Sequence, residues 1–176
     1  MSSCSMSRFS QQTGLVGFVS RQLELLILMM SKIPHSFIAF LARFSIAITF
    51  WTSGQTKIEG LVLDPINLDV QWGMPHISEG AIELFRSEYA LPLLPPEFAA
   101  TMAAGAEHFF PFLLLLGLAS RFSAFALLIM TLVIQTFVYP LAFPTHGLWA
   151  ALMLYIMARG PGVFSLDHLF FRRTQR

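Results

Sequence analysis

The chain has 176 residues, of which 55% are hydrophobic and only 12% are charged. Soluble domains carry about 25% charged residues, so this composition excludes an ordinary water-soluble globule and favours a membrane protein. The 11 basic and 10 acidic residues nearly cancel, which argues against a nucleic-acid-binding protein. The single cysteine, Cys4, excludes an intrachain disulfide, a CxxC redox pair and a cysteine-built metal site. A redox role would therefore require a bound cofactor, a substrate or a partner.

Residues 1–35 precede the first strongly apolar segment. We expect residues 1–14, which are polar and rich in Ser and Gln, to be disordered. In residues 15–32 the polar side chains fall mostly on one helical face, a pattern typical of an interfacial amphipathic helix. A fifth membrane span, with Arg21 and Glu24 paired along the helix, is the alternative.

Four apolar segments follow, and a helix needs about 20 such residues to cross a bilayer. The run 122–158 contains no Asp, Glu, Lys or Arg, and Pro140 and Pro144 mark a turn within it, so it predicts two helices rather than one. The predicted spans are 36–56, 97–118, 122–140 and 146–159. The sequence therefore predicts an all-α integral membrane four-helix bundle within residues 36–172, followed by a basic tail, 173–176.

The segment 58–97 is a long loop between the first two predicted spans. It holds most of the acidic residues of the chain but a single basic one, Arg86. Basic residues gather instead near both termini and in the short link between the second and third spans. By the positive-inside rule, both termini lie in the cytoplasm and the loop lies outside. We expect the loop to form an ordered lid, with Trp72, Tyr89 and Pro92 held against the bundle.

Two ionisable residues, Arg43 and Glu107, fall inside predicted spans, where charged groups are costly and usually paired. We predict that they pair across the antiparallel first and second spans, with Arg121 as the competing cation for Glu107. The pair has three interpretations: a structural salt bridge, a proton-exchanging site that faces a cavity, or an Arg43 that instead extends to the headgroups. Lys57, at the end of the first span, is predicted to extend to the membrane surface.

A second set of polar residues lies among aromatic ones near the outer ends of the spans. We predict that these side chains line an outward-facing pocket: Trp51, His108, Gln135, Tyr139 and His146. Such a set would suit a quinone headgroup or a small substrate, although a hydrogen-bonded structural role is the alternative for each histidine. No HExxH or CxxC spacing occurs, so no metal site is predicted. The sequence also lacks GxGxxG, Walker and GxSxG motifs, which argues against a nucleotide enzyme or a serine hydrolase.

Several short motifs lie between residues 36 and 172, and each occurs once. They are Ala42-Arg43-Phe44, the stretch 53–58, the stretch 87–92, Ala106-Glu107, the stretch 116–121, the stretch 158–162 and Ser165-Leu166-Asp167. In combination they resemble the DoxX family of small four-helix bacterial membrane proteins. The stretch 133–140 resembles a subgroup similar to proteins encoded beside peptide-modifying multinuclear iron oxygenases.

The resemblance implies a multi-pass protein of the bacterial cytoplasmic (inner) membrane that is linked to redox processes. Some relatives look like subunits of quinone-linked oxidoreductases. The leading hypothesis is a membrane-embedded component of a redox or redox-stress system, with quinone as the candidate cofactor and with the lipid bilayer and other membrane or redox subunits as partners. The alternative is a non-enzymatic membrane scaffold or a transport-related protein that serves a peptide-modification or metal-stress pathway. Whether the chain is itself an enzyme stays open.

Overall fold

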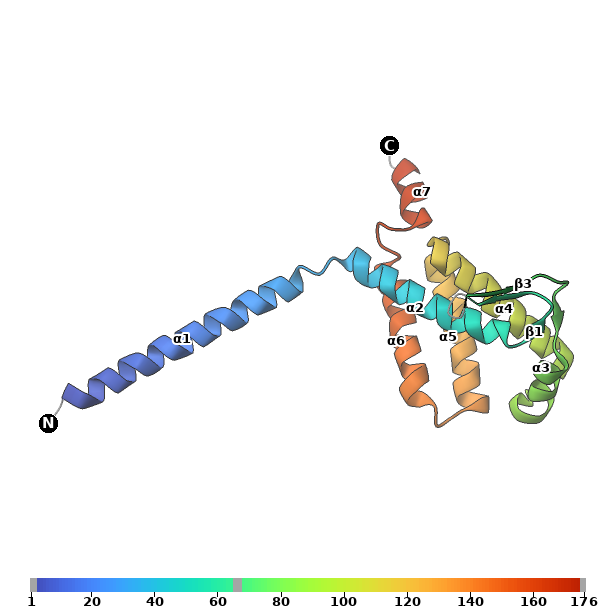
Figure 1. Ribbon diagram of the computed structural model, residues 1–176, viewed down its shortest axis with the longest axis horizontal. Coiled ribbons are helices and arrows are strands. Elements are labelled where there is room, and N and C mark those ends of the chain that lie inside the picture. The colour runs from blue at the N-terminus through green and yellow to red at the C-terminus, as the bar shows by residue number, and fades with distance from the viewer. Residues whose placement is uncertain (1–2, 65–67, 175–176) are drawn as a thin grey trace. The chain divides into compact units, whose positions relative to one another are not determined.

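The structure, a computed structural model, describes residues 3–64 and 68–174 (Figure 1). The chain divides into two compact units, Met1–His35 and Ser36–Arg176, which are described separately. The first unit is dominated by α1 (Ser3–Ser31), one continuous helix. The part of α1 before Leu15, for which the sequence predicts disorder, is therefore helical from Ser3 onward.

The second unit is built on four helices. They are α2 (His35–Gln55), α4 (Pro96–Leu116), α5 (Ser120–Val133), which continues as the π-helix η2 (Ile134–Val138), and α6 (Phe143–Arg159). Within the described residues, three helices are long and apolar enough to cross a membrane: α2, α4 and α5 together with η2. These three match predicted spans closely. The 17-residue α6 is shorter, and α1 is not among the three, so neither the fourth nor the alternative fifth span is established.

The core of the second unit lies where α2, α4, α5 and α6 meet. Its largest buried side chains are Phe50 and Ile46 from α2, Leu114 from α4, Leu127 from α5, and Met153 and Ile156 from α6. Small residues, Ala42 and Ala47 on α2 and Ala124 on α5, are also fully buried there. Small residues allow helix backbones to approach closely, and the resulting van der Waals contacts help to hold membrane helices together.

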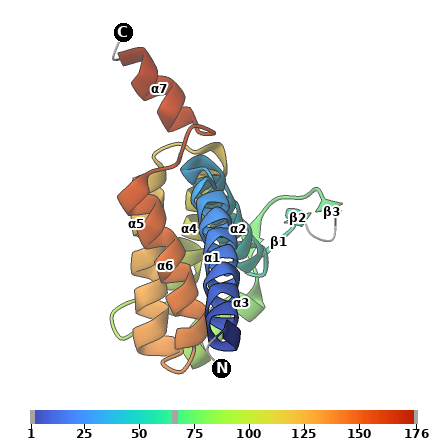
Figure 2. The same ribbon diagram turned by 90° about the vertical axis from the view of Figure 1, so that its left-hand side faces the viewer.

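The loop after α2 contains strands, so the prediction of an all-α fold is wrong there. Strand β1 (Ile58–Glu59) pairs antiparallel with β4 (His76–Ile77), and β2 (Val62–Asp64) pairs antiparallel with β3 (Asp69–Gln71). The β2–β3 hairpin stands out from the side of the helices (Figure 2). After β4 come α3 (Glu79–Leu84) and the π-helix η1 (Phe85–Tyr89).

The predicted contacts of the loop are only partly right. Tyr89 is half-buried, stacks on Phe85 with ring centroids 4.4 Å apart, and packs in a cluster with Ala99 and Ala100 of α4. Trp72, in contrast, is 82% exposed, and Pro92 is exposed as well. The part of the loop nearest α4 is therefore held against the bundle, whereas the part around Trp72 is not.

At the opposite end of the bundle, the chain beyond α6 returns to the α4–α5 connection. Gly117, with φ +68°, ends α4, and its N–H and that of Leu118 close the helix end on Leu114 and Leu113. The carboxylate of Asp167, in α7 (Leu166–Thr174), accepts hydrogen bonds from the N–H groups of Ala119 and Ser120, the residue before α5 and its first residue. Helix α7 includes the first two residues, 173–174, of the predicted basic tail. The other two, 175–176, lie outside the described residues.

Candidate functional site

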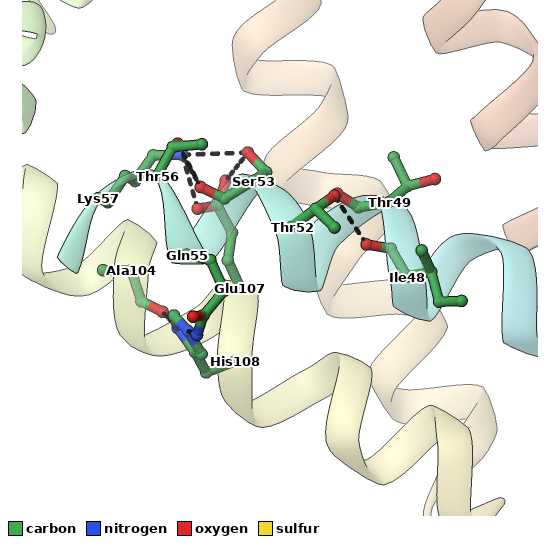
Figure 3. Close-up of polar contacts among 10 residues, drawn as sticks. All are labelled: Ile48, Thr49, Thr52, Ser53, Gln55, Thr56, Lys57, Ala104, Glu107 and His108. Atoms are coloured by element: carbon green, nitrogen blue, oxygen red, sulfur yellow. Dashed lines mark hydrogen bonds and ion pairs between the residues drawn. The ribbon is translucent and has the colours of Figure 1, made fainter. Parts of the chain in front are cut away.

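The loop end of the bundle holds a buried ion pair between Lys57 and Glu107. Lys57 Nζ lies 2.7 Å from Glu107 Oε2, and the two side chains are only 5% and 3% exposed (Figure 3). Lys57 follows α2 by two residues and turns back along the helix, where its ammonium donates to the Ser53 carbonyl at 3.1 Å. The prediction that Lys57 extends to the membrane surface is therefore wrong. Its charge is instead the partner that a carboxylate buried in α4 requires.

Ser53 completes this cluster. Its hydroxyl lies 3.0 Å from Glu107 Oε1, to which it donates, and 3.1 Å from Lys57 Nζ, from which it accepts. Ser53 lies in the last turn of α2 and Lys57 lies two residues beyond its end, and the Lys57 side chain turns back to meet Ser53 there. Both carboxylate oxygens of Glu107 are thus engaged by α2 and the residues that follow it.

At Gly54, α2 and α4 pack closely against each other beside this cluster. A Cβ atom at Gly54 would lie 2.7 Å from His108 Cε1 and 3.0 Å from Glu107 Cβ. The absence of a side chain at Gly54 is therefore what lets the Glu107–His108 turn of α4 approach α2. Pro111, buried one turn further along α4, has no N–H for the Glu107 carbonyl, which leaves that turn less constrained by helical hydrogen bonds.

His108 lies in a second polar network beside the ion pair. Its Nδ1 lies 2.7 Å from the Ala104 carbonyl and its Nε2 lies 2.7 Å from the Gln55 amide nitrogen. A carbonyl can only accept and an amide NH₂ can only donate, so these partners select the tautomer with the proton on Nδ1. The other atom of the Gln55 amide, Oε1, accepts from the backbone N–H of Leu63 at 2.7 Å. The indole of Trp51 lies edge-on to His108, with ring centroids 5.0 Å apart, and donates to the Leu63 carbonyl at 2.8 Å.

An apolar groove adjoins Trp51. It is lined by Phe44, Ile48 and Trp51 of α2, by Phe112 and Leu115 of α4, and by Leu63, Leu68 and Val70 of the β2–β3 hairpin. The groove is therefore built on two candidate membrane spans and on the hairpin that stands beside them (Figure 2). It leads to the same Trp51 ring that contacts His108.

Arg43 lies elsewhere, so the predicted Arg43–Glu107 pair is wrong. The Arg43 guanidinium is buried at the Gly117 end, where Nη1 donates to the Leu114 carbonyl at 2.9 Å and Nη2 donates to the Phe164 carbonyl. It thereby joins α2 to the end of α4 and to the chain that follows α6. A cation is favourable beside the last carbonyls of a helix, which explains a buried arginine that pairs with no carboxylate among the described residues.

The five residues predicted to share one pocket fall into three places. Trp51 and His108 are in contact, as described above. Gln135 and His146 form a second pair: Gln135 Oε1 accepts from His146 Nδ1 at 2.7 Å, and Gln135 Nε2 donates to the Pro140 carbonyl. Tyr139 instead donates to Glu88 Oε1 at 2.5 Å and meets Tyr89 edge-on. The structure therefore places a histidine at each of two separate polar networks.

Tyr139, just beyond the α5–η2 span, gives a prediction about pH. The hydrogen bond to the Glu88 carboxylate, with burial second, raises the pKa of Tyr139 to about 12. The contribution of this bond to stability is therefore present below about pH 10, the ordinary tyrosine pKa, and is lost as the pH rises through about 12. In a spectrophotometric titration, Glu88→Gln should shift tyrosinate formation to lower pH. Glu83→Gln, which removes a partner of Arg86, should not, and identical curves for the two variants would refute the assignment.

Sequence reasoning missed Lys57, Ser53 and Gln55 as members of the site. The available signal was their position, because Ser53, Gln55 and Lys57 are polar residues clustered at the end of a predicted span. Among the described residues, no group of three or more His, Cys, Asp or Glu side chains is arranged to hold a metal ion.

The family model described as DoxX matches residues 38–140, which include α2 except its first three residues, the loop, α4, and α5 with η2. The comparison with curated proteins and the comparison with solved structures each found no match.

Proposed function

The chain belongs to the DoxX family, since the family model covers more than half of it, and from this premise we propose that it is a membrane-embedded, quinone-linked component of a redox system. The observation that carries the proposal is the buried Lys57–Glu107 pair directly beside His108. A buried ionisable pair at the end of candidate membrane helices is a candidate for proton exchange, because such groups are costly to retain for packing alone.

The residues at the loop end fit a quinone ring. Its flat face can stack on the Trp51 indole, and its carbonyl oxygens can accept hydrogen bonds from Trp51 Nε1 or from the Gln55 amide. The apolar groove beside Trp51 offers the ring a route from the bilayer. Small-molecule sites commonly combine apolar walls with a few convergent polar groups, and this one follows that pattern.

The proposed chemistry divides between the chain and its partners. A quinone accepts electrons and an equal number of protons and becomes a quinol. The electrons come from a reduced partner subunit of the membrane redox system. The chain supplies proton transfer: for each electron accepted, the Lys57 ammonium gives one proton to the reduced quinone oxygen, and the Glu107 carboxylate takes up a replacement proton and returns it to the Lys57 amine. His108 holds the Gln55 amide in place and does not itself lose a proton. Ser53, bonded to both charged groups, keeps them in place for this exchange.

One observation favours the alternative, a non-enzymatic membrane scaffold. Helix α1 lies outside the matched residues 38–140, and many of its apolar side chains are exposed, among them Phe18, Leu25 and Ile27. An apolar helix of this length is available for a membrane surface or for another protein.

The two functions are distinguished by what the protein retains when it is purified. We expect quinone, identified by solvent extraction and chromatography, to co-purify with the wild-type protein from its own membrane. His108→Ala should lose most of it. His168→Ala, which alters an exposed histidine of α7, should retain it. A wild-type protein free of quinone, or equal retention of quinone by both variants, would contradict the proposed function. The non-enzymatic membrane scaffold would then be the favoured function.

A further inference from the structure

The two π-helices, η1 and η2, lie against each other, and each ends at or just before a tyrosine. Tyr89 is the last residue of η1, and the N–H of the next residue, Ala90, bonds to the Phe85 carbonyl at 3.0 Å. Tyr139 directly follows η2, and its N–H bonds to the Ile134 carbonyl at 2.8 Å. The two tyrosine rings meet edge-on, with centroids 6.1 Å apart. Because π-helices are rare and often mark functional sites, this contact is a candidate for a role beyond packing.

Glu88 and Tyr139 form the water-exposed side of this contact. Glu88, also in η1, is exposed, and its Oε1 accepts a 2.5 Å hydrogen bond from the Tyr139 hydroxyl. A carboxylate in contact with water can take up a proton, and a hydroxyl bonded to that carboxylate can both give and receive one. The pair can therefore pass a proton from water to the tyrosine.

Tyr89 connects this pair to the buried carboxylate of Glu107. Tyr89 is half-buried, and it packs, like Ala103 of α4, against a cluster that contains Ala100. Ala100, Ala103 and Glu107 are spaced by three and four residues, so they share one face of α4. Burial first, and then the Glu107 and Glu88 carboxylates, raise the pKa of Tyr89. The Tyr89 hydroxyl is therefore near enough to both carboxylates to interact electrostatically with each.

We infer that Glu88, Tyr139 and Tyr89 form a path by which protons from water reach the Lys57–Glu107 pair. Glu88 takes up a proton from water and passes it to the Tyr139 oxygen, while the Tyr139 hydroxyl turns from Glu88 toward Tyr89 and gives up its own proton. Tyr89 receives that proton and gives its own to the Glu107 carboxylate. Each tyrosine gives one proton and gains one, so the net result is one proton moved from water to Glu107.

Each tyrosine receives a proton as it gives one up. The pKa of Tyr89 is raised, and that of Tyr139 is raised to about 12, so free tyrosinate is unfavourable at neutral pH. The transfers are therefore concerted, and a bridging water carries the proton wherever two oxygens are beyond direct hydrogen-bond distance. This inference rests on the proposed function, in which Glu107 takes up a replacement proton, and it adds the path by which that proton arrives.

The test is the rate at which Glu107 is protonated in detergent-purified full-length protein loaded with a quinone that lacks an isoprenoid tail. Time-resolved infrared spectroscopy after a rapid potential step follows the carboxyl band that Glu107→Gln abolishes. Tyr89→Phe removes the hydroxyl but keeps the ring that stacks on Phe85. Glu88→Gln keeps an acceptor for the Tyr139 hydroxyl but cannot carry a proton.

Each variant has a matched control. Tyr155→Phe removes the hydroxyl of a tyrosine in α6 that packs against the core of the four helices. Glu83→Gln neutralises another exposed carboxylate of the loop, one that pairs with Arg86. Thermal denaturation identifies which variants are folded, and if Tyr89→Phe is not, Glu88→Gln decides the outcome.

Tyr89→Phe and Glu88→Gln should each slow the appearance of the Glu107 band by about a hundredfold, the usual contribution of a positioned proton donor, without changing its final amplitude. Both controls should match the wild-type rate. A purely structural role for the path residues predicts unchanged rates in folded variants. Wild-type rates in Tyr89→Phe and Glu88→Gln, with the band present, would overturn the inference while leaving the proposed function standing. A wild-type protein without the Glu107 band would overturn both.

Discussion

Lys57→Met should lower the free energy of unfolding by about 3–5 kcal/mol, because it leaves the Glu107 carboxylate buried without its cation. Glu107→Gln should cost less, since the amide is neutral and still accepts the Ser53 hydrogen bond. The double variant Lys57→Met with Glu107→Gln should be more stable than Lys57→Met alone. Thermal and denaturant unfolding of the detergent-solubilised proteins measure all three.

The matched control for this cycle is Lys32→Met, which removes an exposed lysine and should change stability little. A second cycle, Arg43→Met with Glu107→Gln, should be additive, because Arg43 and Glu107 have separate partners. If the Lys57 and Glu107 substitutions are additive instead, the two residues do not interact and the site is not an ion pair.

Gly54→Ala should destabilise the protein by about 1–3 kcal/mol, the usual effect of overpacking a tight contact. The new Cβ would lie 2.7 Å from the His108 ring, which is held by hydrogen bonds to Ala104 and Gln55 and therefore has little freedom to move away. The same variant should weaken quinone retention, since His108 is displaced. Unfolding and retention are measured on one preparation.

Gly105→Ala is the control for this substitution. It is also a glycine-to-alanine change in a helix of the bundle, but nothing lies within 4 Å of the added Cβ. It should stabilise α4 by about 0.5–1 kcal/mol, as alanine does relative to glycine within a helix. Combining Gly54→Ala with His108→Ala should remove most of the overpacking. Similar stability changes for Gly54→Ala and Gly105→Ala would mean that close packing at Gly54 is unimportant.

The helices were predictable because their apolar runs are long and bounded by clear signals. The bounds of α2 and α4 agree with the predicted spans within two residues, and Pro96 and Gly117 mark the ends of α4. The strands were not predictable, because β1 to β4 are two or three residues long and the β1–β4 pair joins distant parts of the loop. Pairing of such short segments depends on tertiary contacts rather than on a local pattern.

The candidate site was only partly predictable for a geometric reason. Arg43 and Glu107 were both predicted to be charged residues within membrane spans, but the sequence does not show at which depth in the membrane each residue lies on its helix. Arg43 lies ten residues before Ser53 on α2, about 15 Å along the axis, and Ser53 is the residue that meets Glu107. Of the five residues predicted to share one pocket, Trp51 and His108 are in contact, whereas Gln135 and His146 form their own pair beside the turn after η2.

The most direct test of the proposed function is whether Glu107 changes protonation when a quinone is reduced at the site. Infrared difference spectra of the purified protein, recorded as added quinone is reduced electrochemically, report protonation of carboxyl groups. We predict a carboxyl C=O band in the wild-type spectrum that is absent in Glu107→Gln and is retained in Glu88→Gln. A wild-type spectrum without a Glu107-dependent band, or a band that survives in Glu107→Gln, would contradict proton exchange at the Lys57–Glu107 pair.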